Sequence, residues 1–387
     1  MADYLREITS VIDRTVQVIE ITVQDDYDAY MLFETLNDRG LALSVADLLK
    51  NYLFSRAEDR LEDVQENWQE MSSSLASIET KRFLRHYWLS RFAVVRDKDL
   101  FKKIKDNFQS KSSVYRFSLE LRKAADVYAS LYEPSSELWS IFEAGEREQV
   151  QQHLEDLMLF GVNQYNPLLL SVLDENQTIF PSVLRMVRAF AFRYSIIMGS
   201  GTGNIERTFT DAALFVRNNP TCSAKDVFER IEGLYPSDAE FSDAFAERSI
   251  TQAAIARYVL REINNQIEAE SGRIVDKSAF SMNLEHVLPK KFNAEEWQAF
   301  SEGRDDVDLD DFKDRLGNMT LLSSGLNRDI SNKPFAEKLP HYQAAEALSI
   351  SEIIFNSEDW TFSKVEQNQK KLELCPKVGD GRHQAAF

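Results

Sequence analysis

The 387-residue chain has few of the residues that form turns, disulfides and membrane spans. It holds 13 glycines, 9 prolines and two cysteines, Cys222 and Cys375. Scarce glycine and proline argue against an all-β chain rich in turns, and two distant cysteines favour neither a disulfide framework nor a thiolate metal site. No apolar run reaches the roughly 18 residues that span a membrane, and the first residues lack the apolar core of a signal peptide. We therefore expect a cytoplasmic protein with no membrane partner.

Positive charge is also scarce, because the net charge is −18. Phosphate contacts need Lys and Arg, so this balance opposes a nucleic-acid partner unless the basic residues are gathered. Residues 81–123 do gather them, with thirteen Lys and Arg against four acids. Such a stretch is usually a solvated helix face, and its contrast with the rest of the chain keeps contact with DNA as an alternative. We select Arg82, Arg85 and Lys102 as candidate phosphate contacts.

The pattern along the chain predicts a mainly α, α+β protein. Residues 16–23 are β-branched and nearly alternating, which indicates a strand. Ser44 is placed to cap a helix over 45–56, with Asp47 completing a capping box. Residues 60–265 show apolar residues at helical spacing and predict an irregular helical bundle, and further helices are expected at 340–347, 351–355 and 363–374. We predict four parts: 1–58, a strand with two helices; 59–268, the bundle; 269–375, a second domain; and 376–387, a loose tail.

Residues 283–335 contain the residues that can carry chemistry. An acid and a histidine, Glu285 and His286, stand at the end of a short apolar run, and Pro289 is expected to make the chain turn just after it. An imidazole has an unperturbed pKa near ~6.5, so it can take a proton from water at working pH, and a carboxylate can bind a hard cation. Asn318 opens the expected return strand of a hairpin, and Asn327 is expected on a short helix opened by Ser323 or Ser324. Carboxamide oxygens are acceptable ligands for Mg²⁺ or Mn²⁺.

These motifs resemble a known family. The set Glu-His-Val-Leu-Pro, Leu-Gly-Asn-Met-Thr-Leu-Leu, Leu-Asn and Ser-Asn-Lys-Pro-Phe is similar to the HNH-type ββα-metal nucleases. It resembles more closely the C-terminal nuclease domain of the GmrSD-type modification-dependent restriction endonucleases. Residues 33–50 are similar to the end of that family's N-terminal ParB-like nucleotidase domain, so residues 1–58 are expected to be the remnant of such a domain.

The resemblance implies roles for individual residues. His286 would be the general base, Glu285 and Asn327 would bind a Mg²⁺ or Mn²⁺ ion, and Asn318 would tie the hairpin loop and orient His286. Asn332 matches a further asparagine, which we assign to the metal site. Two departures from the family pattern are Glu in place of Asp at 285 and the lack of an Asp-Gly-Gln-Gln-Arg-like nucleotide motif. Basic residues near this centre are further candidates for phosphate contact: Lys290, Lys291, Arg328, Lys333 and Lys338.

We therefore expect a helical bundle followed by a C-terminal ββα-metal, HNH-like nuclease core. Its expected activity is metal-dependent cleavage of double-stranded DNA in phage defence, including DNA with modified bases, and the sequence leaves a homodimer open. Two alternatives remain at this point. The chain could be a catalytically silent subunit that binds DNA or a partner, or it could be an HNH-like ribonuclease.

Overall fold

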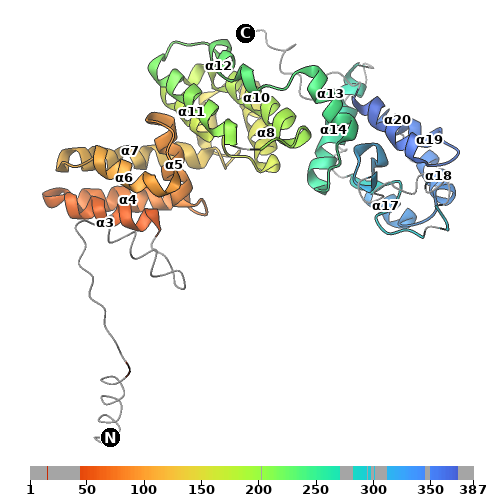
Figure 1. The fold of residues 1–387 in the computed structure, drawn as a ribbon, viewed down its shortest axis with the longest axis horizontal. Coiled ribbons are helices and arrows are strands. Elements are labelled where there is room, and N and C mark those ends of the chain that lie inside the picture. The colour runs from red at the N-terminus through yellow and green to blue at the C-terminus, as the bar shows by residue number, and fades with distance from the viewer. Residues whose placement is uncertain are drawn as a thin grey trace, which may run out of the picture. The chain divides into compact units, whose positions relative to one another are not determined.

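The computed structural model describes residues 15, 44–201, 203–270, 282–293, 295–297, 300, 312–344 and 349–373. The strand predicted at 16–23, residues 33–43 and the tail after 376 lie outside these ranges. The chain forms two compact units, one comprising Met1–Glu70 and Arg96–Glu120 and the other Met71–Val95 and Leu121–Phe387. Two of the three boundaries between them fall inside helices, α4 (Leu61–Leu75) and α7 (Lys111–Ser130) (Figure 1), and the third, between Val95 and Arg96, lies outside a helix. The domain boundaries drawn from the sequence remain predictions.

The first unit is helical throughout its described part. It contains α3 (Val45–Arg56), η1 (Glu58–Arg60), α6 (Asp97–Asn107) and the adjoining parts of α4 and α7. The Ser44 side chain accepts from the Asp47 amide at 3.2 Å while Asp47 accepts from Ser44, which confirms the predicted capping box. Tyr52 fixes α3 against α6, because its hydroxyl donates to the Phe108 carbonyl at 2.9 Å.

The second unit begins as a series of helices, which confirms the mainly helical prediction. Its capping boxes at Ser223–Asp226 and Ser237–Glu240 satisfy amides at the starts of two helices, and Pro167 and Pro181 occupy first turns where no amide donor is needed. No helix in the described ranges is long and apolar enough to cross a membrane. The elements are α5 (Thr80–Arg91), η2 (Glu137–Ile141), α8 (Ala144–Phe160), α9 (Asn166–Glu175), η3 (Gln177–Ile179), α10 (Phe180–Phe190), the π-helical η4 (Ala191–Ile197), α11 (Gly203–Asn218), α12 (Ala224–Ile231), η5 (Glu232–Leu234), α13 (Asp238–Glu247) and α14 (Ala253–Glu270).

A two-stranded hairpin follows these helices. Strands β1 (Asn283–His286) and β2 (Met319–Leu322) pair antiparallel, with Glu285 opposite Thr320 and His286 opposite Met319. This confirms the predicted return strand. Helix α17 (Ser324–Ile330) comes next, and Ser323 caps it by accepting from the Leu326 amide. The remaining elements are η7 (Leu316–Asn318), which enters β2, and then α18 (Phe335–Ala344), η8 (Ser349–Ser351), α19 (Glu352–Phe355) and α20 (Phe362–Glu373).

Helix α18 begins five positions earlier than the sequence suggested. A proline favours the first turn of a helix, so the prediction started this one at Pro340, but Pro340 lies inside α18. The reason is burial. Phe335, Lys338 and Tyr342 recur at three and four residues and are all buried on one face, and packing of that face outweighs the lost backbone hydrogen bond.

An apolar cluster holds the hairpin and its helices together. The cluster includes residues next to the hairpin and residues of α20, so this core is complete only when α20 packs against the hairpin. Its members are Val287, Leu288, Trp297, Phe300, Phe312, Leu322, Ile330, Phe335, Tyr342, Ile354, Trp360, Phe362 and Val365. Two buried amides of α20 also bind η7 directly. Asn368 donates to the Gly317 carbonyl at 2.8 Å, and Gln369 accepts from the Gly317 amide at 2.5 Å.

Close packing at Gly317 gives a test of this arrangement. A Cβ there would lie 2.2 Å from the Val365 carbonyl oxygen and 2.8 Å from the Gln369 nitrogen, both backbone atoms, whereas a Cβ at Gly325 would meet nothing within 4 Å. We expect Gly317→Ala to destabilise by about 3 kcal/mol or more, because backbone must move. Gly325→Ala in α17 should be neutral or stabilising by up to about 1 kcal/mol. Urea unfolding of both variants would measure this, and equal midpoints would contradict the packing.

Candidate active site

The end of β1 places two neighbouring side chains on opposite faces of the hairpin. Successive side chains of a strand alternate in direction. Glu285 is accordingly buried, with 4% of its surface exposed, while the side chain of His286 is 16% exposed. The acid and the imidazole that stand together in sequence therefore meet different partners.

Glu285 belongs to a buried polar cluster. Its Oε1 accepts from Lys338 Nζ at 2.7 Å and from the Tyr342 hydroxyl at 2.8 Å. Burial raises the pKa of Glu285, and Lys338, Tyr342 and the His286 amide oppose that rise. The Lys338 ammonium also donates to the carbonyls of His286 and Val287 at 2.9 and 3.1 Å. All three ammonium donors therefore bind the end of β1 and the residue after it.

His286 faces a second acid, Asp314. The His286 Nε2 lies 3.4 Å from Asp314 Oδ1, and Lys290 Nζ lies 2.8 Å from the same oxygen. The imidazole nitrogen is buried and makes no hydrogen bond within the described residues. Burial and the nearby Lys290 charge lower the pKa of His286, while Asp314 raises it; the net direction is down from 6.5. The ring is therefore neutral at pH 7 and able to accept a proton.

Backbone contacts on both sides fix the position of Asp314. Its carbonyl accepts from the Ile250 amide at 2.7 Å, and Ser249 forms a bridge with Arg315. The segment between α13 and α14 thus pairs with the segment that enters η7. The Lys313 carbonyl, one residue earlier, accepts from Asn318 at 3.0 Å. Asp314 is consequently held beside His286 by contacts that do not involve its own side chain.

Asn318 is fully buried and uses its whole side chain as a clamp. Its Oδ1 accepts from the Leu288 amide at 2.8 Å and from Trp360 Nε1 at 2.9 Å, and its Nδ2 donates to the carbonyls of Leu288 and Lys313 at 3.0 Å each. These four bonds tie the chain after β1 to the chain before β2. The bonds join neighbours of His286 and Asp314, so Asn318 acts on the pair through the backbone.

The three predicted metal ligands lie in different surroundings. Glu285 Oε1 is bound to an ammonium group, which a cation would have to displace. Asn327 donates its Nδ2 to the Leu284 carbonyl at 3.0 Å, and Asn332 is exposed on the turn after α17. Within the described ranges, no three His, Cys, Asp or Glu side chains are grouped to hold a metal. Glu285 as placed therefore does not fit a cation site, and its assignment as a ligand is a prediction that this geometry does not support.

The basic residues near the hairpin divide into accessible and buried ones. Lys290, Lys291 and Arg328 are exposed, and Lys333 is half-buried. Lys338 has no exposed surface, which corrects its assignment as a phosphate contact. It lies inside because the Glu285 carboxylate and two backbone carbonyls replace the water around its ammonium group.

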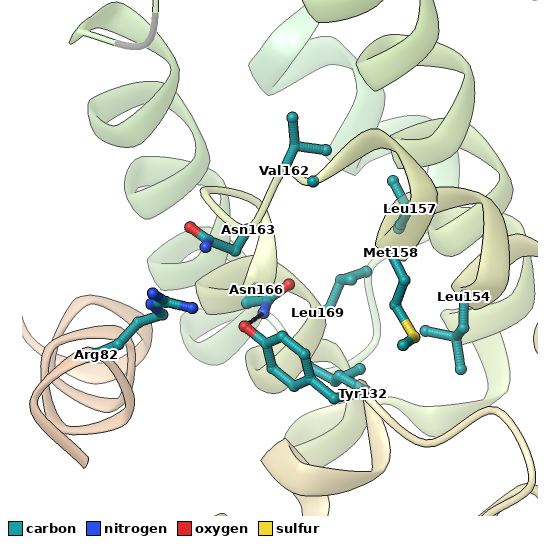
Figure 2. A pocket seen from close by; sticks show the side chains of 11 residues that line it. Arg82, Tyr132, Leu154, Leu157, Met158, Val162, Asn163, Asn166 and Leu169 are labelled. Atoms are coloured by element: carbon teal, nitrogen blue, oxygen red, sulfur yellow. Dashed lines mark hydrogen bonds between the residues drawn. The ribbon is translucent and has the colours of Figure 1, made fainter. Parts of the chain in front are cut away.

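The three residues chosen from the basic stretch lie in different surroundings. Arg82 is on α5 at the rim of a hollow, in the second unit (Figure 2). Arg85, also on α5, is engaged by both carboxylate oxygens of Glu206 and by the Val95 carbonyl, so its guanidinium is already bound. Lys102 belongs to the first unit and lies on the exposed face of α6. Their roles in binding DNA remain predictions.

The sequence reading missed Asp314 and the polar residues of the core. The antiparallel register was the one available signal for Asp314, because residues just before Asn318 must return toward His286. Tyr342 and Gln369 gave no such signal. A polar side chain in a helix of mixed composition looks solvent-exposed until its long-range partner is known.

The buried ion pair gives a test that does not depend on activity. Replacing Lys338 with Met leaves the Glu285 carboxylate buried without its cation, so we expect a loss of about 3–5 kcal/mol of stability. The double variant Lys338→Met with Glu285→Gln should recover part of it, because the remaining group is neutral. Lys291→Met, at an exposed position, is the control. Urea unfolding would measure the stability of the three variants. If K338M unfolds at the same midpoint as K291M, the ion pair between Lys338 and Glu285 does not form.

Comparison with known proteins identifies the segment that contains these residues. No curated protein matches the chain. Residues 235–373 match the model of the family described as GmrSD restriction endonucleases, C-terminal domain. The match begins earlier than the predicted start at 269, and it includes α13 and α14. This agrees with the structure, in which Gln369 Nε2 donates to the Phe245 carbonyl at 2.7 Å and joins the end of α13 to α20. Residues 235–373 are thus similar to the C-terminal domain of the GmrSD restriction endonucleases.

Proposed function

We propose that this chain hydrolyses phosphodiester bonds of DNA, with His286 as the general base. The observation that carries the proposal is the pair of His286 Nε2 and Asp314 Oδ1, 3.4 Å apart inside the segment that matches the restriction endonuclease family. The distance is longer than a formed hydrogen bond, as is common for catalytic pairs before a substrate binds.

The pair can divide the work of proton transfer between the two ring nitrogens. We assign the ring proton to Nε2, the nitrogen that faces Asp314. Nδ1 is then unprotonated and can take a proton from water. The lowered pKa of His286 keeps this nitrogen free at neutral pH. When the ring becomes positively charged, the Asp314 carboxylate stabilises it. Water attack on the phosphate and charge on the base then develop together.

The proposed centre is of the HNH type and its proposed substrate is double-stranded DNA, including DNA with modified bases. The order of strand, strand and helix in β1, β2 and α17 supports this type. A Mg²⁺ or Mn²⁺ ion is part of the proposal on the strength of the family resemblance, and when bound it would neutralise charge on the phosphate. The placed side chains give no ligand set from which to derive its role further.

Replacing the base is the first test. His286→Ala should lower plasmid cleavage about a hundred- to ten-thousand-fold, because general-base catalysis is lost, and should leave DNA binding and the unfolding midpoint nearly unchanged. His341→Ala, a histidine of α18 outside the pair, is the control. The assay is plasmid nicking with and without EDTA, with total RNA in a parallel reaction. Unchanged cutting by H286A would reject His286 as the base. Cleavage of RNA alone would favour the ribonuclease alternative, and no cutting by the parent chain would favour the silent subunit.

The pH dependence tests Asp314. The base works only while it is neutral, so the acid limb of the cleavage rate should lie below pH 6.5, where the lowered pKa of His286 places it. Asp314 raises that pKa, so Asp314→Asn should move the limb to still lower pH and reduce the plateau rate about ten-fold or more. Asp329→Asn, an exposed acid of α17, should match the parent profile. A limb that moves upward in D314N would contradict the proposed interaction.

A further inference from the structure

The second unit contains a hollow of about 230 Å³ that the proposed reaction does not use. Residues of α5, α8 and α9 line it, together with the segment just after α7 and the loop before α9. Its volume is close to the lower limit of the about 300–1,000 Å³ typical of sites for drug-sized ligands. Met158 is 47% exposed and the Arg82 side chain is 42% exposed, so an occupant can extend from the hollow into solvent. The residues that line it are Arg82, Leu131, Tyr132, Leu154, Leu157, Met158, Gly161, Val162, Asn163, Asn166 and Leu169.

The lining has an apolar side and a polar side. Figure 2 shows Leu154, Leu157 and Met158 of α8 on one side, while Arg82 and Asn163 lie on the other. Ligand sites commonly combine an apolar wall with a few placed polar groups. Arg82 is paired with Glu79 at 3.7 Å, and both side chains are largely exposed. An ion pair of this kind is weak, so an anion can replace Glu79.

A buried chain of hydrogen bonds fixes one polar group of the lining. Asn166 Nδ2 donates to the Tyr132 hydroxyl at 2.8 Å, which pairs with the Tyr128 hydroxyl at 3.1 Å, which in turn pairs with His86 Nδ1 at 2.7 Å. Burial, with the charges of Arg85 and Arg82, lowers the pKa of His86 to about 3, so the chain ends on a neutral ring. The chain thus holds the Asn166 carboxamide in one orientation.

The oxygen of that carboxamide is available to a ligand. Asn166 is 8% exposed, and its Oδ1 makes no hydrogen bond within the described residues. The Asn166 Nδ2 donates to Tyr132, so Oδ1 is the atom of this side chain that can accept a hydrogen bond from a ligand in the hollow (Figure 2). A ligand that fills the hollow would cover this acceptor, so it has to supply a donor in place of water.

We propose that the hollow binds a single nucleotide, a proposal that rests on the proposed action on DNA. The base would lie against the leucines and Met158, with an amino group donating to Asn166 Oδ1. The phosphate would bind the Arg82 guanidinium, whose planar donors suit phosphate oxygens. The same chemistry is offered by a free nucleoside monophosphate and by a nucleotide turned out of a DNA duplex, as enzymes that read single bases require.

Two variants separate the two halves of the site. Met158 is 47% exposed, so Met158→Trp can close the hollow without entering the core, and Ile141→Trp, at a 49% exposed position, is the control. Arg82→Met removes the phosphate contact, and Arg207→Met, with 81% of its side chain exposed, is its control. Calorimetry on the full chain would use dAMP, dCMP and the matching nucleosides. We expect M158W to abolish binding of all four, and R82M to weaken only the monophosphates, about ten-fold or more.

A DNA arm identifies the source of the nucleotide. A duplex with one mismatched 2-aminopurine would be added to the His286→Ala chain, and fluorescence would rise if the base leaves the stack. A rise that M158W removes and I141W keeps assigns the hollow to a turned-out nucleotide. Monophosphate binding with no rise assigns it to a free nucleotide. If neither signal depends on Met158 and Arg82, the proposal is overturned. Cleavage by the parent chain is measured separately, so a failed nuclease and a failed nucleotide site give different results.

Discussion

The clamp made by the Asn318 carboxamide is the constraint on which the candidate site depends. A buried amide that left even one of its donors or acceptors unpaired would cost about 1–3 kcal/mol, and this one forms four hydrogen bonds in an apolar cluster. The bonds join Leu288 to Lys313 across a long insertion. The Asn318 side chain therefore holds the end of β1 beside the start of β2 through buried hydrogen bonds. His286 and Asp314 stand beside the residues so joined.

The hairpin separates stability from chemistry by the alternation of its side chains. On the inner face, Glu285, Lys338 and Tyr342 satisfy each other and anchor α18 to β1. On the other face, His286 meets Asp314 with part of its ring accessible. This division explains why Glu285, although it is next to His286 in the sequence, pairs with Lys338 and not with the imidazole. A buried pair of this kind gives little net stability but is costly to break, which suits a group that fixes where α18 sits.

Local patterns in the sequence were sufficient for several of the elements. The capping box at Ser44, the short helix opened by Ser323 or Ser324 and a return strand from Asn318 to Leu322 were all predicted, because each depends on neighbours within a few residues. The structure begins the strand one residue later, at Met319. The start of α18 was wrong, because Pro340 is a local signal and the burial of Phe335 and Tyr342 is not. The role of Gln369 and the burial of Lys338 could not be predicted for the same reason. Each depends on partners far along the chain.

The sequence by itself determined that the chain is mainly helical and that residues 283–335 carry motifs similar to those of the GmrSD restriction endonucleases. It did so because helical periodicity and motif spacing are written in consecutive residues. Only the tertiary structure decided which acid accompanies His286. Glu285 is adjacent along the backbone, but a strand turns adjacent side chains to opposite faces, and the packing of α18 and of the segment after α13 then gives each one its partner.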